Sequence, residues 1–229
     1  MRDAGNARIA VEPTVCAGGS SSRPYHHGNL SLALIAAGRR ILEALGPAAL
    51  SLRAVAREAG VSPAAPYHHF KDKSELLDAV AQEGWHALGQ AINDARIAAT
   101  DPQSVMTEIG VAYVMFARKN PALYRTMYDA AGDRSDMPDH AKAEDSGWRH
   151  VREALIQNGA DPNDEHELVM STIAAWCSVH GVAEMAGFKE FEPIKAAMGG
   201  EEAFVRSLLK HFGAYAQSQG PRPKSAPKV

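Results

Sequence analysis

The segment Ser51–Lys73 constrains the fold of this chain more than any other part of the sequence. Ser51 is a suitable N-cap for a helix, and four apolar residues follow it at helical spacing. These residues are Leu52, Val55, Ala56 and Ala59. Gly60 can adopt the left-handed backbone of a tight turn, and Ser62 can cap a second short helix. A short helix, a glycine turn and a second short helix are typical of a helix-turn-helix that reads DNA.

The remaining hydrophobic pattern predicts an all-α fold. No segment alternates apolar and polar residues for long enough to predict a sheet. Asp72 and Glu75 form a capping pair for a long helix that follows the helix-turn-helix. Helices are predicted at 30–45, 51–59, 62–70, 73–98, 103–119, 122–131, 141–158, 163–187 and 201–217, and loops at 132–140, 159–162 and 188–200.

Composition excludes several classes of protein. The 229-residue chain is 45% hydrophobic with a net charge of −3, so it is globular, and any surface for nucleic acid must be local. The two cysteines, Cys16 and Cys177, predict neither a disulfide framework nor a cysteine-based metal site. We find no run of consecutive apolar residues that suits a membrane span or a signal peptide, and we expect a cytoplasmic protein.

The second short helix of the motif offers a small surface for reading DNA. Short side chains suit a helix that enters the major groove end-on. The candidates for base contacts are Ser62, Pro63, Ala64, Ala65, Pro66 and His68. The candidates for phosphate contacts are Ser51, Arg53, Tyr67 and Lys73, near helix starts whose N–H groups can anchor phosphates. Arg23 lies upstream of the first helix, where an arm could reach the minor groove.

Residues 28–77 resemble the DNA-binding domain of the TetR family of transcriptional regulators. The resemblance is carried by Ser51-Leu-Arg-Ala-Val-Ala-Arg-Glu-Ala-Gly-Val-Ser62, Tyr67-His-His-Phe70 and Lys71-Asp-Lys-Ser-Glu-Leu-Leu77. It implies that Ser51, Arg53, Tyr67 and Lys73 contact phosphates, and that residues 62–66 and His68 face bases. The family's usual Gly-Thr-Leu, or a similar start, before the tyrosine is replaced here by Ala64-Ala65-Pro66. The preferred base sequence is therefore left open.

The resemblance also implies that the later helices form a regulatory domain that dimerises and often binds a small molecule. The segment Trp176-Cys-Ser-Val-His-Gly181 is similar to a Trp…His-Gly signature of one C-terminal subgroup, and residues 120–128 fit the same subgroup. Trp176 and His180 share a helix face. The candidates to line an effector pocket are Tyr113, Phe116, Tyr128, Trp148, Trp176 and His180. The alternative is that each of them is a core residue whose polar atoms bond to neighbours.

The chain is thus predicted to be an all-α homodimer with two domains and two flexible tails. Residues 23–80 form an N-terminal three-helix helix-turn-helix DNA-binding domain, and residues 81–218 form a C-terminal helical domain for ligand binding and dimerisation. The N-terminal tail, residues 1–22, is rich in Gly and Ser, and the C-terminal tail, residues 219–229, is rich in Pro. A dimer is expected because one short recognition segment contacts little DNA. Two of them on a palindromic operator bind more tightly than one.

A small-molecule effector, whose identity is left open, is expected to shift the spacing of the two DNA-binding heads. Repression is the family's usual mode, and activation is the alternative. No catalytic, metal-binding or cofactor-binding residues are predicted, because His166-Glu167 lacks the second histidine of a zinc-protease helix. The rival interpretations are a helical small-molecule-binding protein without DNA function and, third, an enzyme centred on His180.

Overall fold

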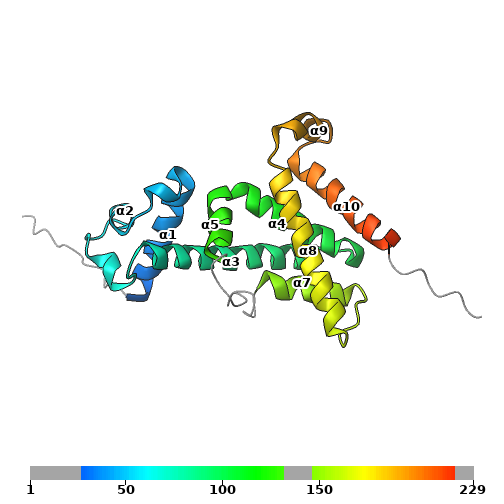
Figure 1. The fold of residues 1–229 in the computed structure, drawn as a ribbon, viewed down its shortest axis with the longest axis horizontal. Coiled ribbons are helices and arrows are strands. Elements are labelled where there is room, and N and C mark those ends of the chain that lie inside the picture. Colours follow the sequence, from blue (N-terminus) through cyan, green and yellow to red (C-terminus); the bar gives the residue numbers. More distant parts are fainter. Residues whose placement is uncertain (1–26, 132–145, 220–229) are drawn as a thin grey trace, which may run out of the picture.

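The structure, a computed structural model, describes residues 27–131 and 146–219. Every regular element in these two ranges is a helix, so the all-α prediction is confirmed. The predicted N-terminal tail, the loop predicted at 132–140 and residues 220–229 lie outside the described part of the chain. A small helical head and a larger helical bundle lie along one long helix, α3 (Figure 1).

The head consists of α1 (His27–Leu45), α2 (Leu52–Glu58) and two short 3₁₀ helices, η1 (Pro47–Ala49) and η2 (Ala65–His68). The α-helix predicted at 62–70 is wrong, because a turn and then η2 occupy this segment. Pro66 has no N–H to donate where the first intrahelical bond of such a helix would form. The amides of His69 and Phe70 instead both donate to the Pro66 carbonyl, at 2.9 Å each.

The helix α3 (Lys73–Ala98) begins and ends where the sequence predicts. The elements that follow are η3 (Pro102–Ser104), α4 (Val105–Lys119), α5 (Pro121–Ala131), α7 (Gly147–Gln157), α8 (Glu165–Met185), η4 (Lys189–Phe191), α9 (Glu192–Ala197) and α10 (Glu201–Gln219). Most of these bounds agree with the predicted helices to within a few residues. One exception is 188–200, where the sequence predicts a loop and the structure has η4 and α9. The helix predicted at 141–158 begins at Gly147, and residues 141–145 of that prediction lie outside the described part of the chain.

A buried lysine explains why α9 forms. The Lys195 side chain is 4% exposed and donates from Nζ to the Ala186 carbonyl, at the end of α8. It also bonds to Glu192 at 2.8 Å and to Glu201 at 3.2 Å. Glu201 accepts a further bond from Arg118 of α4, at 2.8 Å. Polar contacts of Lys195 with the end of α8 and the start of α10 therefore hold this short helix, and hydrophobic periodicity does not reveal them.

The axis of the molecule is α3, which packs against α1, α4, α5 and α7. Its buried residues extend from Leu76, in its first turn, to Ile92. The domain boundary predicted at residue 80 falls inside this helix. The head and the C-terminal helices therefore share one continuous element, which crosses Figure 1 horizontally.

In the described part of the chain, α8 is the one helix long and apolar enough to cross a membrane. A count of consecutive apolar residues misses it, because single polar residues interrupt the sequence. One such helix is weak evidence for a membrane span, since core helices of soluble proteins pass the same test. Only 22% of its most apolar window is buried. The protomer therefore leaves a largely apolar helix face uncovered.

Gly84 lets α3 and α5 approach closely. A Cβ atom at Gly84 would lie 2.8 Å from Sδ of Met127 and 3.0 Å from Cδ1 of Leu123. Both side chains are fully buried, so neither can move away freely.

We therefore expect Gly84→Ala to lower the free energy of unfolding by about 1–3 kcal/mol through overpacking. Urea unfolding at a fixed protein concentration measures the effect. In a Met127→Ala background the same substitution should cost much less, because the main clash is removed. An equal cost in both backgrounds would show that the close contact is not the cause.

Candidate DNA-binding and effector sites

Capping side chains hold the helix-turn-helix of the head. Ser51 Oγ accepts from a backbone amide in the first turn of α2, at 3.1 Å. Gly60 has a φ of 69°, the left-handed conformation that the turn requires. Asp72 accepts from the Glu75 amide at 3.0 Å, and Glu75 accepts from the Lys71 amide at 2.6 Å. The predicted capping pair thus fixes both the start of α3 and its junction with η2.

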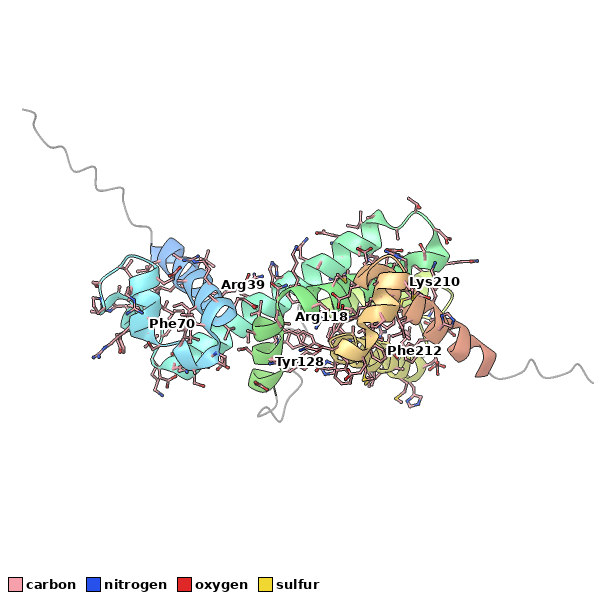
Figure 2. All side chains as sticks on the ribbon, turned by 90° about the horizontal axis from the view of Figure 1, so that it is seen from above. Arg39, Phe70, Arg118, Tyr128, Lys210 and Phe212 are labelled. Carbon is pink, nitrogen blue, oxygen red and sulfur yellow. The ribbon has the colours of Figure 1, made fainter. Side chains whose placement is uncertain are left out.

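The turn from Ser62 to His68 forms an exposed edge of the head. The side chains of Ser62, Pro63, Ala64, Tyr67 and His68 are exposed, and that of Ala65 is half-buried. Tyr67 is 55% exposed, which is high for a large aromatic residue. Beneath the turn lies Phe70, which is buried in the head (Figure 2).

Pro66 requires a correction. The sequence places it among the residues that face bases, but the structure buries it. A buried ring supports the turn from within and cannot reach a base edge.

The polar candidates for phosphate contacts gather around the starts of two helices. Ser51 and Arg53 are exposed at the start of α2, and Lys73 is exposed at the start of α3. Lys73 Nζ donates to the Pro47 carbonyl at 2.7 Å, so its ammonium lies over the segment that precedes α2. Arg23 lies outside the described residues.

Two side chains of α1 connect the head to the helices behind it. Arg39 donates to Glu83 of α3 at 2.8 Å and to Asn120, at the end of α4, at 3.0 Å. Glu43 accepts from the Leu123 amide, in the first turn of α5, at 3.0 Å. A helix N-terminus favours a carboxylate at this position. Arg39 lies between the head and the bundle in Figure 2. A displacement of α5 would therefore act directly on α1.

Behind this connection, seven aromatic side chains from five helices form one group, here called the aromatic cluster. Its members are Trp85 of α3, Tyr113 of α4, Tyr124 and Tyr128 of α5, Trp148 of α7, and Trp176 and His180 of α8. Their ring centroids are 4.5–6.3 Å apart, with mostly tilted or edge-to-face geometry. All three tryptophans of the chain belong to it. Figure 2 shows Tyr128 where α5 meets the bundle.

Hydrogen bonds join five members of the aromatic cluster in one chain. Trp176 Nε1 donates to the Tyr128 hydroxyl at 2.9 Å, and Tyr128 bonds to Tyr113. The Tyr113 hydroxyl lies 3.1 Å from that of Tyr124, which lies 2.5 Å from Nδ1 of His180. The polar atoms of these partly or fully buried rings therefore bond to one another.

Burial raises the pKa values of Tyr113, Tyr124 and Tyr128, because it penalises the phenolate form. Hydrogen bonds with Tyr113 partly oppose this rise in the pKa values of Tyr124 and Tyr128, and the Glu184 carboxylate adds to the rise at Tyr124. The three tyrosines therefore stay uncharged.

The structure brings together five of the six residues predicted to line an effector pocket. Tyr113, Tyr128, Trp148, Trp176 and His180 all belong to the aromatic cluster. Phe116 packs against the core, and no ring contact joins it to the cluster within the described ranges. Its place among the lining residues is therefore not supported by the geometry.

Two members of the cluster, Trp85 and Tyr124, are not among the residues predicted from the sequence. Tyr124 could have been found, because it lies four residues before Tyr128 and so shares a face of α5 with it. Trp85 carries no such signal. Its helical spacing is that of an ordinary core residue of α3.

Two family profiles match the amino-acid sequence. Residues 34–80 match the bacterial regulatory proteins of the tetR family, and residues 106–220 match the tetracyclin repressor-like C-terminal domain. The chain belongs to the TetR family. It is accordingly a DNA-binding transcriptional regulator with a helix-turn-helix domain, in a family of regulators rather than enzymes.

Several solved structures share this fold. A protein of unknown function from Rhodococcus sp. RHA1 is 30% identical, with a TM-score of 0.64 over 84% of this chain and 96% of its own. A putative tetR family transcription regulator from Shewanella sp. PV-4 is 18% identical, with a TM-score of 0.54 over 80% and 96%. The TetR family regulator PfmR from Thermus thermophilus is 20% identical, with a TM-score of 0.51 over 77% and 91%. The last two similarities show the fold alone.

The hydrogen-bond chain predicts the effect of removing one hydroxyl. Tyr128→Phe should lower the free energy of unfolding by about 1–3 kcal/mol, because the Trp176 indole N–H loses its acceptor. Tyr67→Phe removes a hydroxyl from an exposed ring and should change stability by less than about 0.5 kcal/mol. Thermal unfolding of both variants at one protein concentration measures the difference. Equal losses would contradict a buried network in the cluster.

Proposed function

We propose that this TetR-family protein is a ligand-responsive repressor that binds a palindromic operator as a homodimer. The observation that carries the proposal is the physical connection between the two candidate sites. The exposed turn at 62–68 and the aromatic cluster are joined by α3 and by the contacts from α1 to α5 (Figure 1). Repression is proposed because it is the family's usual mode.

In this proposal the head reads DNA with short side chains. Ser62, Pro63, Ala64, Ala65 and His68 face base edges in the major groove. The phosphate contacts come from Ser51, Arg53, Tyr67, Lys73 and, from the arm, Arg23. Few of the base-facing groups can donate or accept hydrogen bonds. Specificity therefore depends on methyl contacts, DNA shape and the spacing of the two heads.

The exposed face of α8 supports dimerisation. Met170, Ile173, Cys177, Gly181 and Met185 are exposed along one stripe of this helix. Phe212 of α10 is 47% exposed, and Figure 2 places it at the end of the molecule away from the head. Apolar stripes of this kind gain stability by packing against a second copy. We propose that α8 and α10 form a four-helix interface with their symmetry mates.

We propose that the effector binds at the aromatic cluster. We also propose that the chain belongs to the subgroup with a Trp…His-Gly signature, and Trp176–Gly181 of α8 supports this. A ligand shifts the heads only if it binds one of their arrangements more tightly than the other. Tyr124 and Tyr128 lie on α5, whose first turn is held by Glu43 of α1. Movement of α5 on ligand binding would therefore change the position of the head.

We assign residues 23–80 to DNA binding and residues 81–218 to regulation and dimerisation, with α3 shared between them. The chain has a net charge of −3, so its affinity for DNA has to come from the local surface of the head. We propose that the protein works in the cytoplasm, where a transcriptional regulator meets DNA.

Selection from a pool of random duplexes tests the DNA-binding part of this proposal. We expect the purified protein at moderate salt to enrich sequences with two inverted half-sites, spaced by whole turns of DNA. Enrichment of no sequence would point to a helical small-molecule-binding protein without DNA function.

The enriched duplex then tests the role of Lys73. Lys73→Ala should weaken binding to all sequences alike and flatten the dependence of log affinity on log salt by about one unit. Lys210→Ala is the matched control, because this exposed lysine of α10 lies at the other end of the molecule (Figure 2). It should leave both quantities unchanged. A change in the preferred sequence caused by Lys73→Ala would show that the residue contacts bases.

Cys177 provides a native test of the dimer interface. In a Cys16→Ser background, a short bis-maleimide should cross-link two protomers through Cys177, which is exposed on the α8 stripe. The control variant carries Cys16→Ser, Cys177→Ser and Ser62→Cys. Its single cysteine therefore lies in the head. It should not cross-link, because the heads of a dimer lie about one helical turn of DNA apart. The opposite pattern on a denaturing gel would place the interface elsewhere.

A further inference from the structure

The direction of each hydrogen bond in the aromatic cluster follows from the donors available. The indole N–H of Trp176 can only donate, so the Tyr128 oxygen accepts from it. Each of the three tyrosines has one hydroxyl hydrogen. If His180 Nδ1 accepts, Tyr128 donates to Tyr113, Tyr113 to Tyr124, and Tyr124 to His180. Every hydroxyl hydrogen then has an acceptor.

The opposite direction leaves one hydrogen unused. If Nδ1 of His180 carried a hydrogen, it would donate to Tyr124. Tyr124 would then donate to Tyr113, and Tyr113 to Tyr128. The Tyr128 oxygen would then accept from both Trp176 and Tyr113, and its own hydrogen would have no acceptor in the chain. The first direction uses all three hydroxyl hydrogens, whereas this one leaves the hydrogen of the partly buried Tyr128 without an acceptor in the cluster. The first direction is therefore favoured, and it places the ring hydrogen of neutral His180 on Nε2.

The Nε2–H group of His180 is left available to a ligand. Its other nitrogen, Nδ1, is used by Tyr124, and no hydrogen bond to Nε2 occurs among the residues that the structure describes. His180, Trp176, Tyr128 and Trp148 are each partly exposed. The site thus offers aromatic faces and one fixed donor.

Two features of the cluster disfavour a bound anion. Tyr113 is almost fully buried, so a ligand that packs against the cluster loses hydration. The Glu184 carboxylate lies close enough to Tyr124 to raise the pKa of that tyrosine, and it would repel a ligand carboxylate as well.

We propose that the effector is a neutral, planar aromatic molecule that carries a hydrogen-bond acceptor, such as a carbonyl oxygen, which accepts from Nε2–H of His180. This inference rests on the proposed function, because it takes the aromatic cluster to be the effector site. The rings of Trp148, Trp176 and Tyr128 stack on or around the ligand. The hydrogen bond from His180 fixes the orientation of the ligand. It also favours a ligand with an acceptor over an aromatic hydrocarbon without one.

Three naphthalenes of similar shape test this proposal on the full-length protein. They are 2-acetonaphthone, which has a neutral carbonyl, 2-ethylnaphthalene, which has no acceptor, and 2-naphthoate, which is an anion. Equilibrium dialysis measures affinity. A change in tryptophan emission assigns binding to the cluster, because all three tryptophans lie there. We expect 2-acetonaphthone to bind about two- to tenfold more tightly than 2-ethylnaphthalene and 2-naphthoate to bind most weakly.

Variants at His180 separate hydrogen bonding from packing. His180→Phe keeps a ring but has no donor, so it should bind 2-acetonaphthone and 2-ethylnaphthalene equally. His180→Gln keeps an N–H near the position of Nε2 and should retain the preference for the ketone. Circular dichroism verifies that both variants are folded. Retention of the full preference by His180→Phe would overturn the role of His180.

The unmodified protein provides a readout that needs no variant. The ¹⁵N shifts of a histidine-labelled sample distinguish the two neutral tautomers, and we expect Nε2–H for His180. The Nδ1–H tautomer would overturn the proposed direction of the hydrogen bonds. Tightest binding of 2-naphthoate, or no binding of any of the three probes, would overturn the proposed ligand class.

The outcome for the effector is independent of the outcome for DNA. A protein that enriches a palindromic duplex but binds none of the naphthalenes would refute the ligand class and leave the regulator intact. A protein that binds 2-acetonaphthone and enriches no duplex would refute the regulator and leave the ligand class intact.

Discussion

The structure depends on the buried face of α3 from Leu76 to Ile92, which packs in both the head and the bundle. The first turn of α3 is fixed by Asp72 and Glu75, and its apolar face continues from Leu76 to Ile92. One end packs in the head and the rest packs in the bundle, so neither part can move without affecting this helix. A regulator needs such a shared element, because coupling between two sites requires a structure that both sites bias. The polar contacts of Arg39 and Glu43 add a second connection beside it.

The aromatic cluster is both part of the core and the candidate effector site. Tyr113 is almost fully buried, whereas Tyr128, Trp148, Trp176 and His180 are partly exposed. The buried end fixes the ring positions, and the exposed end leaves aromatic faces and a donor for a ligand. Because the tyrosines bond to one another, the rings are held before any ligand arrives, which reduces the entropy lost on binding.

The local signals of the sequence predict the head well. Ser51 and Asp72 cap the helices that they are expected to cap, and Gly60 has the expected left-handed backbone. These interactions span only a few residues, so the sequence order itself contains them. The same reasoning fails at Pro66, where a missing N–H turns an expected α-helix into a 3₁₀ turn and buries the ring. It also fails at α9, where Lys195 bonds to the end of α8 and the start of α10, contacts that hydrophobic periodicity does not reveal.

The sequence by itself determined the helical class, the helix-turn-helix and the residues of its exposed turn, because capping and periodicity act over one or two turns. It also supplied the aromatic residues from which the candidate site is built. Only the tertiary structure decided which of them meet. Trp85 and Tyr124 join the cluster, and Phe116 does not make ring contact with it, because helix packing selects neighbours that are far apart in the chain. The tautomer inferred for His180 likewise depends on hydroxyl groups that three helices bring together.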